Sequence, residues 1–167
     1  GSIIEKKAKN ANIYIIKRSN ASQSPNYFWT SDFKTFTPVT NVYPEKNYNW
    51  LTSELISYKT LNGAISQGIL YKPENFDSSQ KYPVIFHYYE KKSHNLNKFI
   101  KPAYANNEIN IPWFVSRGYL VFTPDIYYQT GNPGKSAFNS IVAAARHLTK
   151  FKWIDTLRMG LQGHSFG

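Results

Sequence analysis

Two apolar runs in the second half of the chain restrict its fold more than any other feature. Residues 82–89 read Tyr-Pro-Val-Ile-Phe-His-Tyr-Tyr, and residues 119–123 read Tyr-Leu-Val-Phe-Thr. Runs with so few polar residues are typical of strands that are buried on both faces of a sheet. A short helical pattern at 113–117, ended by Gly118, lies between them, and an amphipathic pattern follows at 137–150. Alternation of strands and helices predicts a parallel sheet with crossover helices.

The amphipathic pattern predicts a helix that leads into a last strand at 158–162. We expect Ser136 to cap this helix, because serine oxygens accept hydrogen bonds from the first free N–H groups of a helix. The spacing of the apolar residues predicts one buried face. That face contains Phe138, Ile141, Val142, Ala145 and Leu148.

Antiparallel pairing is predicted earlier in the chain. Residues 53–59 and 65–71 are strand-like and flank Asn62-Gly63, which is a strong hairpin signal. This hairpin is expected to form an antiparallel edge of the same sheet.

The first 47 residues predict a separate β-rich segment. Strand patterns at 12–17 and 27–30 are separated by turn-forming residues at 19–26, and a third strand is predicted at 33–40. Residues 42–48 contain a proline and several polar residues, which is typical of a linker. The chain is therefore divided into a β-rich segment, 3–47, and an α/β segment, 48–167.

Charge and composition exclude several classes of protein. The chain has 20 Lys and Arg against 10 Asp and Glu, a net charge of +10. The basic residues are scattered rather than gathered in one run or on one helix face, which indicates a solvated surface and no nucleic-acid partner. Disulfides and thiolate metal sites are excluded because the chain has no cysteine. No apolar run approaches the roughly 18 residues of a membrane span. The compartment stays open, with an extracytoplasmic location slightly favoured.

The last five residues carry a catalytic motif. Residues 163–167, Gly-His-Ser-Phe-Gly, fit the G-x-S-x-G pattern of a nucleophile elbow, a sharp turn that follows a strand. The predicted strand at 158–162 provides that context. Ser165 is expected to adopt a strained backbone, and side chains at Gly163 and Gly167 would collide with a neighbouring strand or helix.

From residue 48 onward the sequence resembles the front part of the catalytic domain of the prolyl oligopeptidase family. The dipeptidyl peptidase IV and acylaminoacyl-peptidase branches are the most similar. The resemblance rests on residues 75–85, 114–125 and 151–167, where Asp155 and Arg158 precede the elbow at a specific spacing. More weakly, residues 3–47 resemble the closing strands of the β-propeller that precedes this domain.

The resemblance implies an α/β fold that forms the front half of an α/β-hydrolase, with a mostly parallel sheet, an antiparallel edge hairpin and propeller strands before it. It implies a serine peptidase that cleaves peptides through an acyl-enzyme on Ser165, without cofactor or metal. The family's oxyanion hole corresponds to the Phe166 backbone N–H and the Tyr89 hydroxyl, with Tyr88 as the alternative. The chain departs from the family at Glu90-Lys91-Lys92, beside the expected substrate.

The acid and base of a catalytic triad are not found among these residues. In this fold they follow the serine in sequence, whereas His87, His94 and His147 precede it. His164 is expected to pack against the elbow, and Asp155 and Arg158 to fix the turn before the last strand. We therefore expect this chain alone to be inactive. Because part of the sheet would be uncovered, we also expect self-association, a further C-terminal segment or proteolysis at the elbow.

Two alternatives stay open. One is an esterase or lipase-like hydrolase that shares the fold and the elbow. The other is a non-catalytic β-rich binding module with a coincidental motif. A single exposed stripe of Tyr14, Tyr27 and Trp29 would favour the binding module, and their burial would favour the propeller strands.

Overall fold

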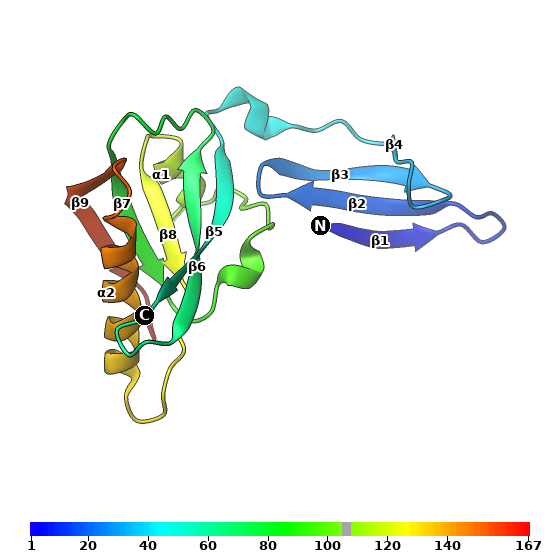
Figure 1. Cartoon of the computed structure of the whole chain (residues 1–167). Coiled ribbons are helices and arrows are strands. Elements are labelled where there is room, and N and C mark those ends of the chain that lie inside the picture. The colour runs from blue at the N-terminus through cyan, green and yellow to red at the C-terminus, as the bar shows by residue number, and fades with distance from the viewer. Residues whose placement is uncertain (105–107) are drawn as a thin grey trace.

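The computed structural model describes residues 1–104 and 108–167, which form two β-sheets (Figure 1). The first sheet is antiparallel, with the strands in sequence order. Its strands are β1 (Ser2–Lys7), β2 (Tyr14–Asn20), β3 (Gln23–Thr30) and β4 (Thr37–Pro38). The second sheet has the spatial order β5-β6-β8-β7-β9. Its strands are β5 (Leu51–Lys59), β6 (Ile65–Pro73), β7 (Tyr82–Tyr88), β8 (Leu120–Pro124) and β9 (Ile154–Gly163).

The second sheet is mixed: three parallel strands, β8, β7 and β9, lie beside the antiparallel edge hairpin that the sequence predicted. β7 is parallel to β8 and to β9, whereas β6 is antiparallel to β5 and to β8. The predicted hairpin is present, and Gly63 in its turn has φ +86°, a value that glycine adopts without steric cost. Because the hairpin joins the sheet through β6, it contributes two antiparallel pairings rather than one.

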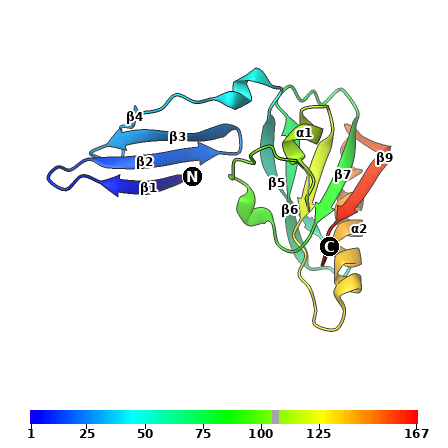
Figure 2. The ribbon, with the colours of Figure 1, turned by 180° about the vertical axis from the view of Figure 1, so that it is seen from behind.

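Helices cover both faces of the second sheet (Figures 1 and 2). α1 (Ile111–Val115) packs over a cluster that includes Leu51, Ile69 and Val121. α2 (Pro133–Leu148) packs on the opposite face, over a cluster that includes Leu70 and Phe122. Successive residues of β6 and β8 therefore belong to opposite clusters, as expected for strands that are buried on both sides.

The start and buried face of α2 differ from the prediction. The helix begins at Pro133 with Asn132 as N-cap, and Ser136 lies within its first turn, where its hydroxyl donates to the Asn132 carbonyl at 2.9 Å. Phe138, expected in the core, is 59% exposed. Small residues let the helix lie close to the bulky side chains of the sheet. The buried residues are Ser136, Ser140, Ala143, Ala144 and Leu148.

The first sheet also differs from the prediction. β1 was not predicted, the turn between β2 and β3 is confined to Ala21-Ser22, and the third predicted strand is reduced to the short β4. Polar residues belong to β3 because the linker satisfies them. Ser24 and Asn26 both donate to the Val42 carbonyl, at 2.6 and 2.7 Å. A 3₁₀ turn, η1 (Pro44–Asn47), occupies the predicted linker.

The two sheets meet where the β2–β3 turn contacts the start of β5. The indole N–H of Trp50 donates to the Ala21 carbonyl at 3.1 Å, and the Ser22 hydroxyl donates to the Leu51 carbonyl at 3.1 Å. Glu45 of η1 accepts a hydrogen bond from the Ser24 backbone at 3.2 Å. In the part of the chain that the structure describes, none of the helices has the length and hydropathy to cross a membrane.

Candidate active site

The G-x-S-x-G motif forms a tight turn at the end of β9, which lies beside the end of β7 (Figure 2). Ser165 has φ +54°, in the left-handed region that non-glycine residues rarely adopt. The Gly167 N–H closes the turn by donating to the His164 carbonyl at 2.8 Å. Such a backbone costs about 1–3 kcal/mol and is typical of functional positions. Ser165 is exposed at the tip of the turn.

Neither glycine of the motif could be replaced by a larger residue, because an added Cβ would collide with the surrounding backbone. A Cβ at Gly163 would collide with the Gly167 carbonyl and lie 3.1 Å from the Tyr88 ring, and a Cβ at Gly167 would collide with the Tyr88 carbonyl. The neighbouring strand is β7, which pairs with β9 through Tyr88 and Gly163. The expected collision of side chains with a neighbouring strand is therefore confirmed.

Aromatic side chains surround the elbow. The Tyr89 ring meets the Phe166 ring edge-on at 6.5 Å, which brings the two sequence-predicted oxyanion-hole residues to one place. Tyr128, which the sequence reasoning missed, packs on Phe166 at 4.5 Å and donates its hydroxyl to the Tyr89 carbonyl at 2.8 Å. Burial raises the pKa of Tyr128, which keeps its hydroxyl protonated and able to donate. Among the described residues the Phe166 N–H donates to no acceptor.

A buried carboxylate fixes the loop that follows Tyr89. Asp125, 1% exposed at the end of β8, accepts hydrogen bonds from the backbone of Lys92 at 2.6 Å and of Ser93 at 2.8 Å. The Ser93 hydroxyl adds a third at 2.6 Å. These groups lie at the start of η2 (Ser93–Asn95), a single turn. The loop that departs from the family is thus held firmly. The sequence signal for this role is the position of Asp125, directly after a buried strand.

A second polar network lies under the elbow. His87, 2% exposed on β7, contacts the Gln162 side chain of β9, three residues before the serine. Its other ring nitrogen lies 3.5 Å from the Lys92 amine, which forms an ion pair with Glu108. Burial lowers the pKa of His87, although the contact with Gln162 opposes this shift. A neutral, buried His87 positions the strand and is not placed to act on Ser165.

The remaining sequence-predicted residues lie away from the serine. His164 is exposed rather than packed, so that prediction was wrong. His147 lies on α2 against Tyr58, with ring centroids 6.2 Å apart. Arg158 donates to Asp155 at 2.7 Å, and both residues lie within β9 rather than in a turn before it. None of the four histidines hydrogen-bonds to Ser165 within the described residues.

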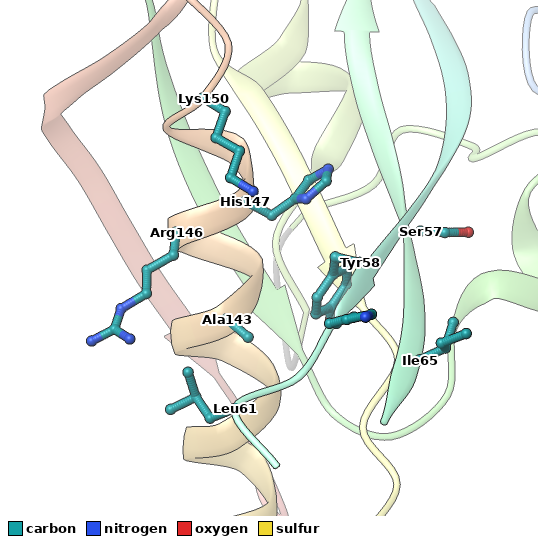
Figure 3. A pocket seen from close by; sticks show the side chains of 9 residues that line it. Ser57, Tyr58, Leu61, Ile65, Ala143, Arg146, His147 and Lys150 are labelled. Atoms are coloured by element: carbon teal, nitrogen blue, oxygen red, sulfur yellow. The ribbon is translucent and has the colours of Figure 1, made fainter. Parts of the chain in front are cut away.

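Two further surfaces lie away from the elbow, one on each sheet. A cavity of about 460 Å³ lies between α2 and the β5–β6 hairpin (Figure 3). On the first sheet, Tyr27 and Trp29 are 38% and 40% exposed and share one face, whereas Tyr14 pairs with buried Thr30 and belongs to the other face. The three residues therefore form no single stripe. Residues 1–104 and 108–167 contain no group of three or more His, Asp or Glu side chains arranged to hold a metal.

Comparison with known proteins shows similarity in structure at low sequence identity. No protein-family model and no curated protein sequence matches the chain. Dipeptidyl peptidase 4 from Porphyromonas gingivalis matches with a TM-score of 0.61 and 19% identity, over 99% of this chain and 25% of that one. A putative dipeptidyl aminopeptidase IV from Bacteroides ovatus matches with a TM-score of 0.57 and 22% identity, over 99% and 25%. Prolyl oligopeptidase B from Galerina marginata gives 0.65 and 13%, over 98% and 24%.

The matched part includes both sheets, because nearly the whole chain is covered in each comparison. The chain spans about a quarter of the length of these solved structures. The fold of this chain is therefore similar to part of the structures of prolyl oligopeptidase-family proteins.

Proposed function

We propose that the chain carries the nucleophile and oxyanion hole of a serine peptidase of the prolyl oligopeptidase type. The observation that carries this proposal is the left-handed backbone of Ser165, held between two glycines that the turn itself and β7 leave no room to replace. A strained serine that is exposed on a strand-to-helix elbow is how an α/β-hydrolase presents its nucleophile. The similarity of fold over both sheets supports the same assignment.

In the proposed reaction the Ser165 hydroxyl attacks the carbonyl carbon of a peptide bond. The Phe166 N–H and the Tyr89 hydroxyl donate to the oxyanion that forms, and the bond to the leaving amine then breaks to give an acyl-enzyme. Water attacks this ester and releases the free acid and Ser165. The Tyr89 position is supported by its edge-on contact with Phe166 and by the Tyr128 hydrogen bond to its carbonyl.

A base must accept the Ser165 proton and return it to the leaving amine. Within the described residues no histidine side chain hydrogen-bonds to the serine. We therefore assign the base and its orienting carboxylate to polypeptide outside residues 1–167, and the activity to the longer protein that contains them. The domain assignment follows: 3–47 are proposed as closing propeller strands and 48–167 as the front of the catalytic domain.

A peptidase is favoured over an esterase by the first sheet. The fold similarity covers this sheet as well as the hydrolase-like part, whereas an esterase or lipase of this fold would not need it. Hydrolysis rates for a peptide anilide and for a simple ester of the same acyl group separate the two. A peptidase retains substantial turnover of the anilide, and an esterase cleaves only the ester.

The test is labelling of the longest polypeptide that contains this sequence with a fluorophosphonate, which reacts with an activated serine. We expect one labelled site, at Ser165, and complete loss of labelling and peptidase activity in Ser165→Ala. Tyr89→Phe should lower turnover by about 10²–10³ while leaving labelling of the folded protein measurable. Unchanged peptidase turnover in Ser165→Ala would exclude the proposal. Residues 1–167 alone should give no burst with an activated ester.

A further inference from the structure

The three parallel strands of the second sheet end at the same edge. β7, β8 and β9 run in one direction, so the segments that follow their carboxyl ends lie near one another (Figure 2). Tyr89 follows β7, Tyr128 follows β8, and Phe166 follows β9. Ligand sites in sheets of parallel strands usually lie outside these carboxyl ends. The same edge carries Ser165.

The three aromatic residues contact one another in every pair. The Tyr128 ring packs on the Phe166 ring with the centroids 4.5 Å apart, and the Tyr89 ring meets Phe166 edge-on at 6.5 Å. The Tyr128 hydroxyl donates to the Tyr89 carbonyl at 2.8 Å. Two of the three residues carry the proposed donors of the oxyanion hole. Tyr128 therefore contacts both donor residues, one through its ring and the other through its hydroxyl.

Tyr89 depends on such contacts because it lies beyond the end of its strand. The pairing of β7 with β9 ends at Tyr88, and the Tyr89 side chain is 38% exposed. The segment after β8 holds the backbone at this point. Besides the Tyr128 hydrogen bond, the Ile126 N–H donates to the Glu90 carbonyl at 3.2 Å. The position of the Tyr89 backbone is thus set by residues 126–128.

The Tyr89 ring has neighbours of its own. The Lys92 ammonium lies 5.9 Å from its centroid, and the Lys92 amine is paired with Glu108. The Phe166 ring lies at another side of it. These contacts restrict the rotation of the ring, whereas the Tyr128 hydroxyl restrains the backbone from which the ring extends.

The geometry of an oxyanion hole decides how well it works. A donor stabilises the transition state when it is already aimed at the place where negative charge develops. A misplacement of about 1 Å can lower the rate about 10²-fold. A residue that fixes the separation of two donors therefore affects turnover more than it affects binding of the substrate.

We propose that Tyr128 is a positioning residue of the oxyanion hole, which fixes the Tyr89 hydroxyl relative to the Phe166 N–H. It acts through these two residues and does not touch the reacting atoms. The inference rests on the proposed peptidase function and adds a third residue, from the segment after β8, to the same site.

The experiment measures kcat and KM for a peptide anilide, with the longest polypeptide that contains this sequence. Complete titration with a fluorophosphonate counts the molecules with a reactive Ser165, so kcat refers to folded enzyme alone. Tyr128→Phe keeps the ring on Phe166 and removes the hydrogen bond to the Tyr89 carbonyl. We expect kcat to fall about three- to tenfold, as for the loss of one hydrogen bond, with KM unchanged.

Tyr127→Phe is the matched control. This neighbouring tyrosine is 50% exposed, and its ring lies 4.2 Å from the Lys91 ammonium. Its substitution should change neither kcat nor KM. Tyr128→Leu removes the ring contact with Phe166 as well and should lower kcat further than Tyr128→Phe.

A double substitution separates positioning from a general effect on stability. Once Tyr89→Phe has removed the donor, adding Tyr128→Phe should lower kcat less than twofold, because no Tyr89 hydroxyl is left to position. The same fold-loss in both backgrounds, a change in KM alone, or an unchanged kcat in Tyr128→Phe would overturn this role and leave the peptidase function standing. Absence of labelling at Ser165 in the unchanged protein would refute the peptidase function itself, and this role with it.

Discussion

The two sheets of the molecule are stabilised in different ways. In the second sheet β6 and β8 are buried on both faces, and clusters of large apolar side chains fill the space under α1 and α2. In residues 1–47, all of which the structure describes, Ile16 and Ala21 are the buried apolar residues, and every residue of β1 is exposed. Several other buried positions of the first sheet are polar. They include Ser24, Asn26 and Thr30.

This difference shows that the first sheet does not carry a core comparable with that of the second. Burial of apolar area is the dominant favourable term in folding, at about 25 cal/mol per Å². A sheet that buries little apolar area depends on hydrogen bonds, such as those of Asn26 with the linker, and on contacts with other parts of the protein. The exposed residues Ile3, Tyr27 and Trp29 are consistent with that dependence.

The largest expected effect compares two isoleucines in the two sheets. Ile69 of β6 is 0% exposed and Ile16 of β2 is 2% exposed. Ile69→Ala should lower the free energy of unfolding by about 4 kcal/mol, and Ile16→Ala by about 2 kcal/mol, because fewer large neighbours surround the second cavity. Urea unfolding followed by tryptophan fluorescence measures both. Equal losses would show that the first sheet has a core of similar quality.

Asp125 tests whether polar contacts are as important in the second sheet as in the first. Asp125→Ala removes the acceptor of the Lys92 and Ser93 backbone N–H groups and leaves them unsatisfied, at a cost of about 3 kcal/mol. Amide hydrogen exchange should accelerate in residues 90–95 and stay unchanged in β2 and β3. Asp125→Asn keeps one acceptor oxygen and should lose about half as much. Unchanged exchange in residues 90–95 would show that the carboxylate does not hold this loop.

The contact between the sheets is expected to have a smaller effect. Trp50→Phe keeps the stacking on Phe99 but removes the hydrogen bond to the Ala21 carbonyl, which should cost about 1 kcal/mol. Cleavage by trypsin after Lys46 should become faster, because the β2–β3 turn then holds the linker less firmly. Ser22→Ala tests the second hydrogen bond between the sheets in the same assay. A cleavage rate equal to that of the unchanged protein in both variants would show that these bonds do not couple the sheets.

The sequence predicted the second sheet better than the first, for physical reasons. Runs such as 82–89 are long, apolar and flanked by turn residues, so local pattern and tertiary environment agree. In β3 the polar residues 23–26 resemble a turn, but they pair with β2, and the Ser24 and Asn26 side chains donate to the distant Val42 carbonyl. Part of the buried face of α2 was missed for a related reason. Close approach to Tyr58 and Phe122 favours alanine and serine over the larger Phe138.

Local pattern also predicted part of the candidate site. The glycines of the elbow follow from sterics within five residues, and their collisions with Tyr88 agree with that expectation. Tyr128 and Gln162 contribute through partners far away in sequence, Tyr89 and His87. Local sequence periodicity does not predict pairs of residues that are so far apart in the chain. The roles of Ser165, Tyr89 and Phe166 in catalysis stay predictions until they are tested.

The smallest expected effect is a difference between the two sheets in how their stability depends on pH. All four histidines follow residue 80, so none lies in the first sheet. Burial lowers the pKa of His87 and of His147 below the ordinary value of 6.5. The unfolded chain therefore binds protons near pH 6.5 that the folded chain does not, and stability must fall as the pH drops below 6.5. The loss should level off below the folded pKa values.

Urea unfolding at pH 7 and at pH 5.5 measures this loss of stability, which we expect to be confined to the second sheet. His87→Gln is expected to flatten the pH dependence, whatever its effect on stability at pH 7, because it removes a group whose pKa differs between the two states. His94→Gln, which replaces an exposed histidine, is the matched control. Amide hydrogen exchange in β2 and β3 should show the same protection at both pH values, once it is corrected for the intrinsic exchange rate. If the first sheet instead loosens on acidification, its stability depends on the histidine-containing sheet through Trp50 and Glu45 rather than on its own hydrogen bonds.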